Sequence, residues 1–255
     1  MTILSSAVTI SALVFACVFG AALLAMRLRV AIPEHHLNAN AENAIKLAAG
    51  LVGTMAALVL GLLLAAAENQ YNADSSEATQ MAATAVLLDR MLSGFGGDAA
   101  PVRAELRRSV EVMRNGIWPG DSSTPVQLDP SMEDGAALYQ AIESLAPNND
   151  IQRSLKPQIA QKTIALGQMR WQLAEQANNE ISVPLLVVVV SWLAIIFFSY
   201  GLFAPANGTV VAMLVVAALS VSGAIFLILE LNTPFGGVIQ IASAPMDTAL
   251  SHLGR

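Results

Sequence analysis

Long runs of apolar residues without a single charge are the first feature of this chain. They cover residues 1–26, 47–67 and 181–229. A helix that crosses a membrane needs about 20 mostly apolar residues. The first two runs therefore predict one membrane-spanning helix each, and the third is long enough to predict two.

The third run contains a sequence that favours a turn. Residues 204–208 are Ala-Pro-Ala-Asn-Gly, so we expect the third span over about 184–203 and the fourth over about 210–229. The first run differs from a signal peptide, because no base precedes Ile3 while Arg27 and Arg29 follow directly. We therefore expect an uncleaved first span.

The basic residues near the spans predict an orientation. Lysine and arginine collect on the cytoplasmic side of membrane spans. The short loop at 27–46 carries Arg27, Arg29 and Lys46, whereas on the other side only Lys162 and Arg170 lie within twenty residues of a span. We expect both short loops in the cytoplasm, and both termini and residues 68–182 outside it.

Most charges lie between the second and third spans. This region holds 15 of the 19 acidic and nine of the 13 basic residues. Its apolar positions follow alternating spacings of three and four, which predicts a helix with one buried face; these are Ala78, Met81, Ala85, Leu88 and Leu92. Because no helix breaker precedes them, we expect the second span to continue as one helix until the glycines at 94–97.

Three more helices are expected in this region. One covers about 101–117 and is followed by a polar loop. Ser131 and Asp134 have the spacing of a capping box, which predicts a second helix beginning there. The third begins near Asp150 and leads toward the third span.

Together these patterns predict an all-α integral membrane protein with four transmembrane helices and a helical extramembrane domain inserted between the second and the third. Residues 1–67 hold the first two spans, 68–182 the acidic helical domain, 183–231 the other two spans and 232–255 an interfacial tail. The tail is expected to lie on the membrane surface through its apolar residues Val238, Ile241, Leu250 and Leu253.

Composition excludes several classes of function. Charged residues make up 13% of the chain and the net charge is −6, which argues against nucleic-acid binding because that requires a clustered basic face. The single cysteine, Cys17, excludes an intrachain disulfide. His35 and His36 beside Glu34 are interpreted as a solvated loop rather than a metal site. We predict no enzyme activity, no cofactor and no metal.

Four short motifs carry a family resemblance. They are residues 68–71 after the second span, 117–119 at a helix end, 170–173 before the third span and 231–237 (Leu-Asn-Thr-Pro-Phe-Gly-Gly) after the fourth. With them the chain resembles the bestrophin-like family of bacterial membrane proteins, a domain of unknown function. The resemblance implies a relation to anion channels and a place in the bacterial inner membrane. Where family members usually have an Asp-Arg pair and a later base, this chain has Asn232, Thr233 and Gln240.

The second span carries a small residue at every fourth position: Ala49, Gly53, Ala57, Gly61 and Ala65. Small residues let another helix approach closely in lipid. The stripe is expected either to pack against a span of the same chain or to meet copies of itself around an axis and line a pore. In the second case Thr54 would supply a hydroxyl to the path, and dewetting at residues 58–64 would gate it.

Two acids lie at matching ends of spans. Glu230 is the only charge between residues 181 and 246, and Glu68 follows the second span on the same side. An acid at membrane depth is a functional candidate, whereas one at the water interface is an anchor. In an oligomer the two acids would form a ring at one mouth and favour cations, which conflicts with the anion channels that the resemblance implies.

The motif Pro234-Phe235-Gly236-Gly237 is interpreted as a helix stop that turns the chain into the interface. The alternative is a gating element in which Phe235 forms the constriction.

Two functions therefore stay open. The first is an oligomeric bestrophin-like ion channel whose second span lines the path. The second is a non-catalytic accessory or sensing subunit whose helical domain binds a partner in a membrane complex. The lipid bilayer is a partner in both, and the first requires a homo-oligomer.

Overall fold

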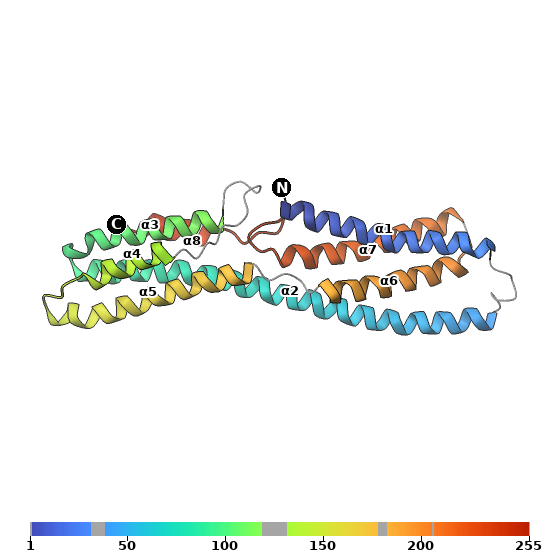
Figure 1. Cartoon of the computed structure of the whole chain (residues 1–255), viewed down its shortest axis with the longest axis horizontal. Helices are drawn as coiled ribbons and strands as arrows, with labels where there is room; N and C mark the ends of the chain where they lie inside the picture. The colour runs from blue at the N-terminus through green and yellow to red at the C-terminus, as the bar shows by residue number, and fades with distance from the viewer. Residues whose placement is uncertain (1, 32–38, 119–131, 178–182, 206, 255) are drawn as a thin grey trace. The chain divides into compact units, whose positions relative to one another are not determined.

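The computed structural model describes residues 2–31, 39–118, 132–177, 183–205 and 207–254. Within these ranges every regular element is a helix and none is a strand, which confirms the all-α prediction. In chain order the helices are α1 (Thr2–Ala31), α2 (Ala39–Phe95), the short 3-10 helix η2 (Gly97–Ala99), α3 (Ala100–Ile117), α4 (Met132–Glu143), α5 (Asp150–Ala177), α6 (Val183–Phe203), α7 (Gly208–Leu231) and α8 (Ala244–His252) (Figure 1).

The chain forms two compact units. The apolar unit comprises Ile3–Gln70 and Glu180–Asn232. The polar unit comprises Tyr71–Asn179 and Thr233–Arg255, together with Met1–Thr2. Helix α2 contributes to both, because the division at residues 70 and 71 falls inside it.

Within the described ranges, four helices are long and apolar enough to cross a membrane, as the sequence predicted. They are Ala7–Ala31 of α1, Glu42–Phe95 of α2, α6 and α7. Helix α2 runs without a break from its apolar half into its polar half and ends at Phe95. Gly96 then takes a positive φ of 105°, a conformation that glycine adopts without steric cost. The predicted continuous helix is therefore confirmed.

The core of the apolar unit is formed by apolar side chains from all four of its helices. Val18 and Ala22 of α1, Ala56 of α2, Val189 of α6 and Ala218 of α7 are among its members. At one point two backbones come into close contact, because a Cβ atom added at Gly201 of α6 would overlap the carbonyl oxygen of Ala22. Such close approach is typical of helices packed in lipid.

Polar contacts in the apolar unit satisfy helix ends. The side chain of Asn207 accepts a hydrogen bond from the backbone of Val210 at 2.9 Å and caps α7. The guanidinium of Arg29, near the end of α1, donates to the carbonyl oxygen of Ala204 at 2.6 Å, just beyond the end of α6. Both contacts support the predicted turn between α6 and α7, of which residue 206 lies outside the described ranges.

The polar unit has a core of larger side chains. All five predicted residues of the α2 face are buried, and they pack with apolar residues of α3, α4 and α5. Examples are Leu106 and Ile117 of α3, Leu138 of α4 and Leu166 of α5. Helix α5 continues through Pro157 to Ala177. The predicted capping box is not tested, because Ser131 and the side chain of Asp134 lie outside the described part of the chain.

The C-terminal tail belongs to the core of the polar unit. Phe235, Ile241, Met246 and Leu253 are buried in the same cluster as the apolar face of α2. This corrects the expectation that Ile241, Leu253 and the partly buried Leu250 lie on a membrane surface. The apolar spacing was recognised, but its partner is protein, because α2 and α3 offer an apolar surface that the sequence pattern alone did not assign.

Candidate functional site: the exposed face of α2 and the docked tail

The small-residue stripe of α2 does not lie on one face. Ala49 is buried, and a Cβ atom at Gly53 would lie 3.8 Å from Cδ1 of Ile196. Ala57, Gly61 and Ala65 are exposed. The reason is helical geometry: four residues advance the helix by about 400°, so a strict spacing of four drifts by about 40° at each step.

The exposed side of α2 carries a row of residues, mostly with small side chains, whose spacings are three or four. We call this set the narrow face of α2; its members are Gly50, Thr54, Ala57, Gly61, Ala65 and Glu68. Around Gly50 and Gly61 no atom lies within 4 Å of an added Cβ. The Thr54 hydroxyl donates to the carbonyl oxygen of Leu51 at 2.8 Å, so its lone pairs face outward from the helix. Gly50 was not among the predicted positions, although the helical period of 3.6 residues places it on this face.

Two other faces complete this half of α2. One packs against the apolar core through Ala49, Val52, Ala56, Val59 and Leu63. The other presents large exposed side chains, which are Leu47, Leu51, Met55, Leu58 and Leu62. The helix therefore has one face for its own chain, one bulky apolar face and one narrow face. Leu60, which the gating hypothesis included, packs against the core.

The two acids have different surroundings. Glu68 is exposed at the end of the narrow face. Glu230 is 1% exposed, although it is close to the end of α7. The structure therefore does not bring them together as a pair of water-facing acids, because the side chain of Glu230 is enclosed by protein. A buried carboxylate near a span end is held by protein rather than by solvent.

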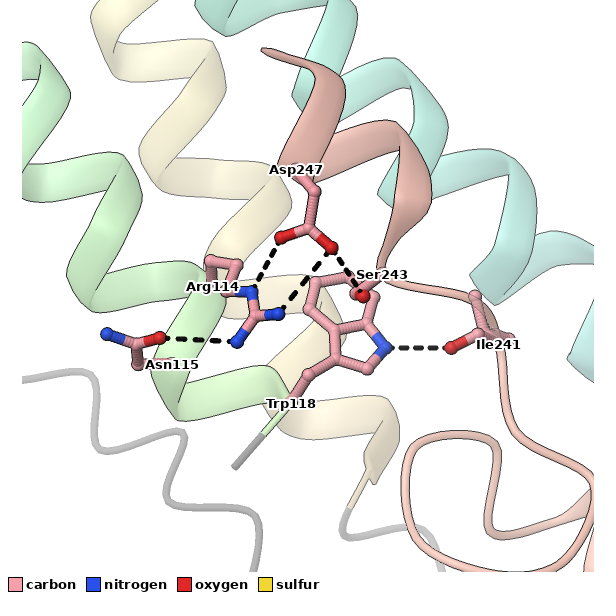
Figure 2. A network of polar contacts seen from close by, with 6 residues as sticks. All are labelled: Arg114, Asn115, Trp118, Ile241, Ser243 and Asp247. Carbon is pink, nitrogen blue, oxygen red and sulfur yellow. Dashed lines mark hydrogen bonds and ion pairs between the residues drawn. The ribbon is translucent and has the colours of Figure 1, made fainter. Parts of the chain in front are cut away.

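The motif at residues 234–237 leads the chain into the polar unit. Pro234 and Phe235 are buried and Gly237 is partly buried. The rings of Phe235 and Trp118 meet edge to face, with centroids 5.6 Å apart. Trp118 follows α3, and its Nε1 donates to the carbonyl oxygen of Ile241 at 2.7 Å (Figure 2). Phe235 is thus an anchor that docks the tail on α3.

A polar network joins α8 to the same end of α3. The Arg114 guanidinium donates to both carboxylate oxygens of Asp247, at 2.8 and 3.5 Å, and the Ser243 hydroxyl donates to Asp247 at 2.7 Å (Figure 2). The bond from Arg114, followed by that from Ser243, lowers the pKa of Asp247 below its ordinary value. Because Asp247 is partly exposed, solvent screens this pair.

A second charged pair holds the end of the tail. The guanidinium of Arg103 donates two bonds of 2.8 Å to the carboxylate of Asp89, which raises the pKa of Arg103. The backbone N–H of Gly254 donates to the same carboxylate at 3.4 Å. Arg107 donates to the carbonyl oxygen of Leu253 at 3.0 Å. Sequence reasoning could not find the two contacts of the tail, since Gly254 and Leu253 lie 165 and 146 positions from their partners.

Neutral side chains stand at the positions where the family resemblance implies charged ones. The Asn232 amide donates to the carbonyl oxygen of Ile228 at 2.8 Å, and the Gln240 amide donates to that of Gly237 at 2.8 Å. Both bonds cap local backbone. Among the described residues, no three His, Cys, Asp or Glu side chains form a group that could hold a metal ion. Glu34, His35 and His36 lie outside those residues.

Comparisons with known proteins agree with this architecture. A bacterial bestrophin homologue from Klebsiella pneumoniae, solved as several point mutants, matches with a TM-score of 0.69 and 12% identity over 94% of this chain and 96% of that one. Another of these mutants gives a TM-score of 0.64 and 13% identity over 92% and 97% of the two chains. A structure described as a membrane protein gives a TM-score of 0.61 at 14% identity over 95% and 97%.

At such identities these structures show a shared fold. No curated protein matches the sequence. The model of the bestrophin-like domain, however, matches residues 16–246. The protein is therefore a multi-pass membrane protein of the bestrophin type, and the chain belongs to the bestrophin-like family.

Proposed function

We propose that the protein is a homo-oligomeric ion channel in which the narrow face of α2 lines the path. The observation that carries this proposal is that Thr54, Ala57, Gly61 and Ala65, which all have small side chains, are exposed in the single chain. The fold shared with bacterial bestrophin homologues supports the same interpretation.

The two exposed faces of α2 differ in the size of their side chains. Acyl chains accommodate large apolar side chains such as Leu51 and Leu58, which are 65% exposed. A face made of Gly and Ala makes few van der Waals contacts with lipid. It does, however, let helices from other copies approach closely, or it leaves room for ions between them. The narrow face therefore suits an axis shared by several copies.

Ion preference would be set outside the apolar stretch. No charged residue lies between residues 47 and 67, so the lining can offer only the Thr54 hydroxyl and backbone dipoles. Glu68 is exposed at the end of the narrow face, where a ring of carboxylates would attract cations and repel anions. Whether the path selects anions, as the family resemblance implies, then depends on how strongly this ring acts.

Ion flux into liposomes tests the proposal. Purified wild-type protein should pass a small anion or monovalent cation faster than empty vesicles do, because the narrow face provides a path. Gly61→Leu should reduce the flux, since the new side chain points into that path. Gly223→Leu is the matched control, because Gly223 is an exposed glycine of α7 with no atom within 4 Å of an added Cβ.

Glu68→Gln should change the ratio of anion to cation flux without abolishing it. Wild-type flux no greater than that of empty vesicles, for anions and cations alike, would contradict the channel. Equal flux through Gly61→Leu and Gly223→Leu would contradict the assignment of the path to α2.

A second candidate function is that of an accessory subunit whose polar unit binds a partner. Ile164 and Trp171 of α5 favour it, because they are 50% and 56% exposed and lie seven residues apart on one face. Exposed tryptophan is enriched in protein interfaces. Trp171→Ala should leave ion flux unchanged under the channel hypothesis, and loss of copurifying subunits in this variant would favour the accessory role.

The side of the membrane on which the polar unit lies stays a prediction from the charge order. Ser144 is exposed in the polar unit. In a Cys17→Ala background, Ser144→Cys should react with a membrane-impermeant thiol reagent on intact cells if that unit is extracytoplasmic. Labelling only after lysis would place it in the cytoplasm.

A further inference from the structure

A groove with a volume of about 550 Å³ lies between α2 and α8 of the polar unit. Its floor is made of small and medium apolar side chains, among them Ala82, Ala83 and Val86 of α2 and Pro245 of α8. The volume is within the range of sites for small organic molecules. Two nitrogen-bearing side chains, Arg90 and His252, also line the groove.

Arg90 and His252 lie at the same end of the groove. The backbone N–H of Gly254 donates to the carboxylate of Asp89 at 3.4 Å, so the end of α8 lies beside the Asp89–Arg90 turn of α2. The two helices therefore run in the same direction along the groove. From Ala82 to Arg90 the rise of the helix gives an apolar length of about 12 Å. The groove thus has a polar end and an apolar body.

The charge at this end has no partner in the described part of the chain. Other arginines of the polar unit have a carboxylate within 4.0 Å, including Arg103, Arg107 and Arg114. Arg90 is exposed and forms no such pair. No aspartate or glutamate lines the groove, even though the whole chain has 19 acidic and 13 basic residues. The site is therefore complementary to an anion.

From this arrangement we infer that the groove binds a small amphipathic carboxylate. The carboxylate accepts hydrogen bonds from the Arg90 guanidinium, whose planar fork matches it with two donors, and from the imidazole of His252. The apolar body of the ligand lies along Ala82, Ala83 and Val86. Small side chains on both helices leave the space that this body occupies.

Isothermal titration calorimetry with octanoate tests the inference, using the full-length protein in a neutral detergent. Octanoate should bind saturably to the wild type. Arg90→Gln should weaken the binding by about tenfold or more, because it removes a charge-assisted hydrogen bond. Lys162→Gln is the matched control, since Lys162 is an exposed base of α5 that does not line the groove, and it should bind octanoate like the wild type.

Three further arms separate the two parts of the site. Acetate has the head without the body, and octanol has the body without the charge, so both should bind at least tenfold more weakly than octanoate. Ala83→Trp should abolish binding by filling the groove. Because Ala83 is exposed, the variant is expected to fold, and its melting temperature checks this.

Binding that is equal in the wild type and Arg90→Gln, or that is as strong for octanol, would overturn the inference. The absence of saturable binding would also overturn it. If Ala83→Trp instead lowers the oligomer mass while octanoate does not bind, the groove is a contact between copies of the chain and the inference is wrong.

Discussion

The two halves of α2 stabilise the protein in different ways. In the polar unit, one face of the helix is buried to within a few per cent, and Met81, Leu88 and Leu92 there are fully covered. In the apolar unit, the buried positions of α2 are mostly small, such as Ala49 and Ala56, while leucines face outward. In water the hydrophobic effect favours burial of large apolar side chains. In lipid there is no such driving force, because the acyl chains are as apolar as leucine.

The polar contacts differ in the same way. In the polar unit, charged side chains join different helices, as Asp89 does with Arg103 and Arg114 does with Asp247. In the apolar unit, Glu42 forms an ion pair with Lys46 within the same helix, α2. The remaining polar groups mostly satisfy helix backbone. The polar unit thus combines a buried apolar core with charge pairs between helices, whereas the apolar unit combines its apolar core with close backbone contact at Gly201.

The largest expected effect follows the removal of Trp118, the ring that Phe235 contacts in the polar unit. Trp118→Ala should lower the stability of that unit by about 3–5 kcal/mol, because it removes a buried ring and leaves a cavity beside Phe235. Trp118→Phe should cost about 1 kcal/mol, since it removes chiefly the hydrogen bond to Ile241. Hydrogen exchange of residues 233–253 measures both.

In Trp118→Ala those amides should exchange faster while amides of α6 and α7 keep their protection. Equal loss of protection in both units would show that they do not differ in the way described above.

A smaller effect is expected at the closest contact of the apolar unit. Gly201→Ala should destabilise the protein by about 1–3 kcal/mol, because the added methyl group meets the backbone of Ala22, which cannot move aside easily. Gly223→Ala has open space and serves as the control. Thermal unfolding in a neutral detergent compares them. Equal melting temperatures for the two variants would contradict close backbone packing at Gly201.

The buried face of α2 in the polar unit could be predicted, because apolar Met81 and Leu88 alternate with polar neighbours such as Gln80 and Arg90. In the apolar unit every face of the helix is apolar, so the hydropathy pattern cannot show which face is buried. The strict spacing of four suggested one stripe, but it joined the buried Ala49 to the exposed Ala65. Only the packing of neighbouring helices separates them.

Long-range contacts were the other part that the sequence did not predict. The apolar residues of the tail were recognised, but an amphipathic pattern is the same whether it faces lipid or protein. The edge-to-face contact of Trp118 and Phe235 joins residues 117 positions apart, and no local signal encodes it. Burial of Glu230 likewise depends on the helices around it.

The smallest expected effect concerns pH and the docking of α8. Because the folded pKa of Asp247 is lowered, the pair with Arg114 contributes stability above the ordinary aspartate value of about 3.9. That contribution is lost as the pH falls through the folded pKa. Hydrogen exchange of residues 244–252 should therefore lose protection below about pH 4 in the wild type.

Asp247→Asn should show a weaker dependence on pH over the same range, because the titrating group is gone. An identical pH profile in the two proteins would show that Asp247 does not contribute to the docking of α8.

If the narrow face of α2 meets the same face of other copies, crosslinking at two alanines should reveal it. Ala57 and Ala66 are both exposed on α2, and nine residues place them on opposite sides of the helix. In a Cys17→Ala background and in vesicles, Ala57→Cys should form crosslinked dimers and larger species with a short thiol crosslinker. Ala66→Cys should stay monomeric. Crosslinking that is stronger at Ala66→Cys, or absent at Ala57→Cys, would contradict the account.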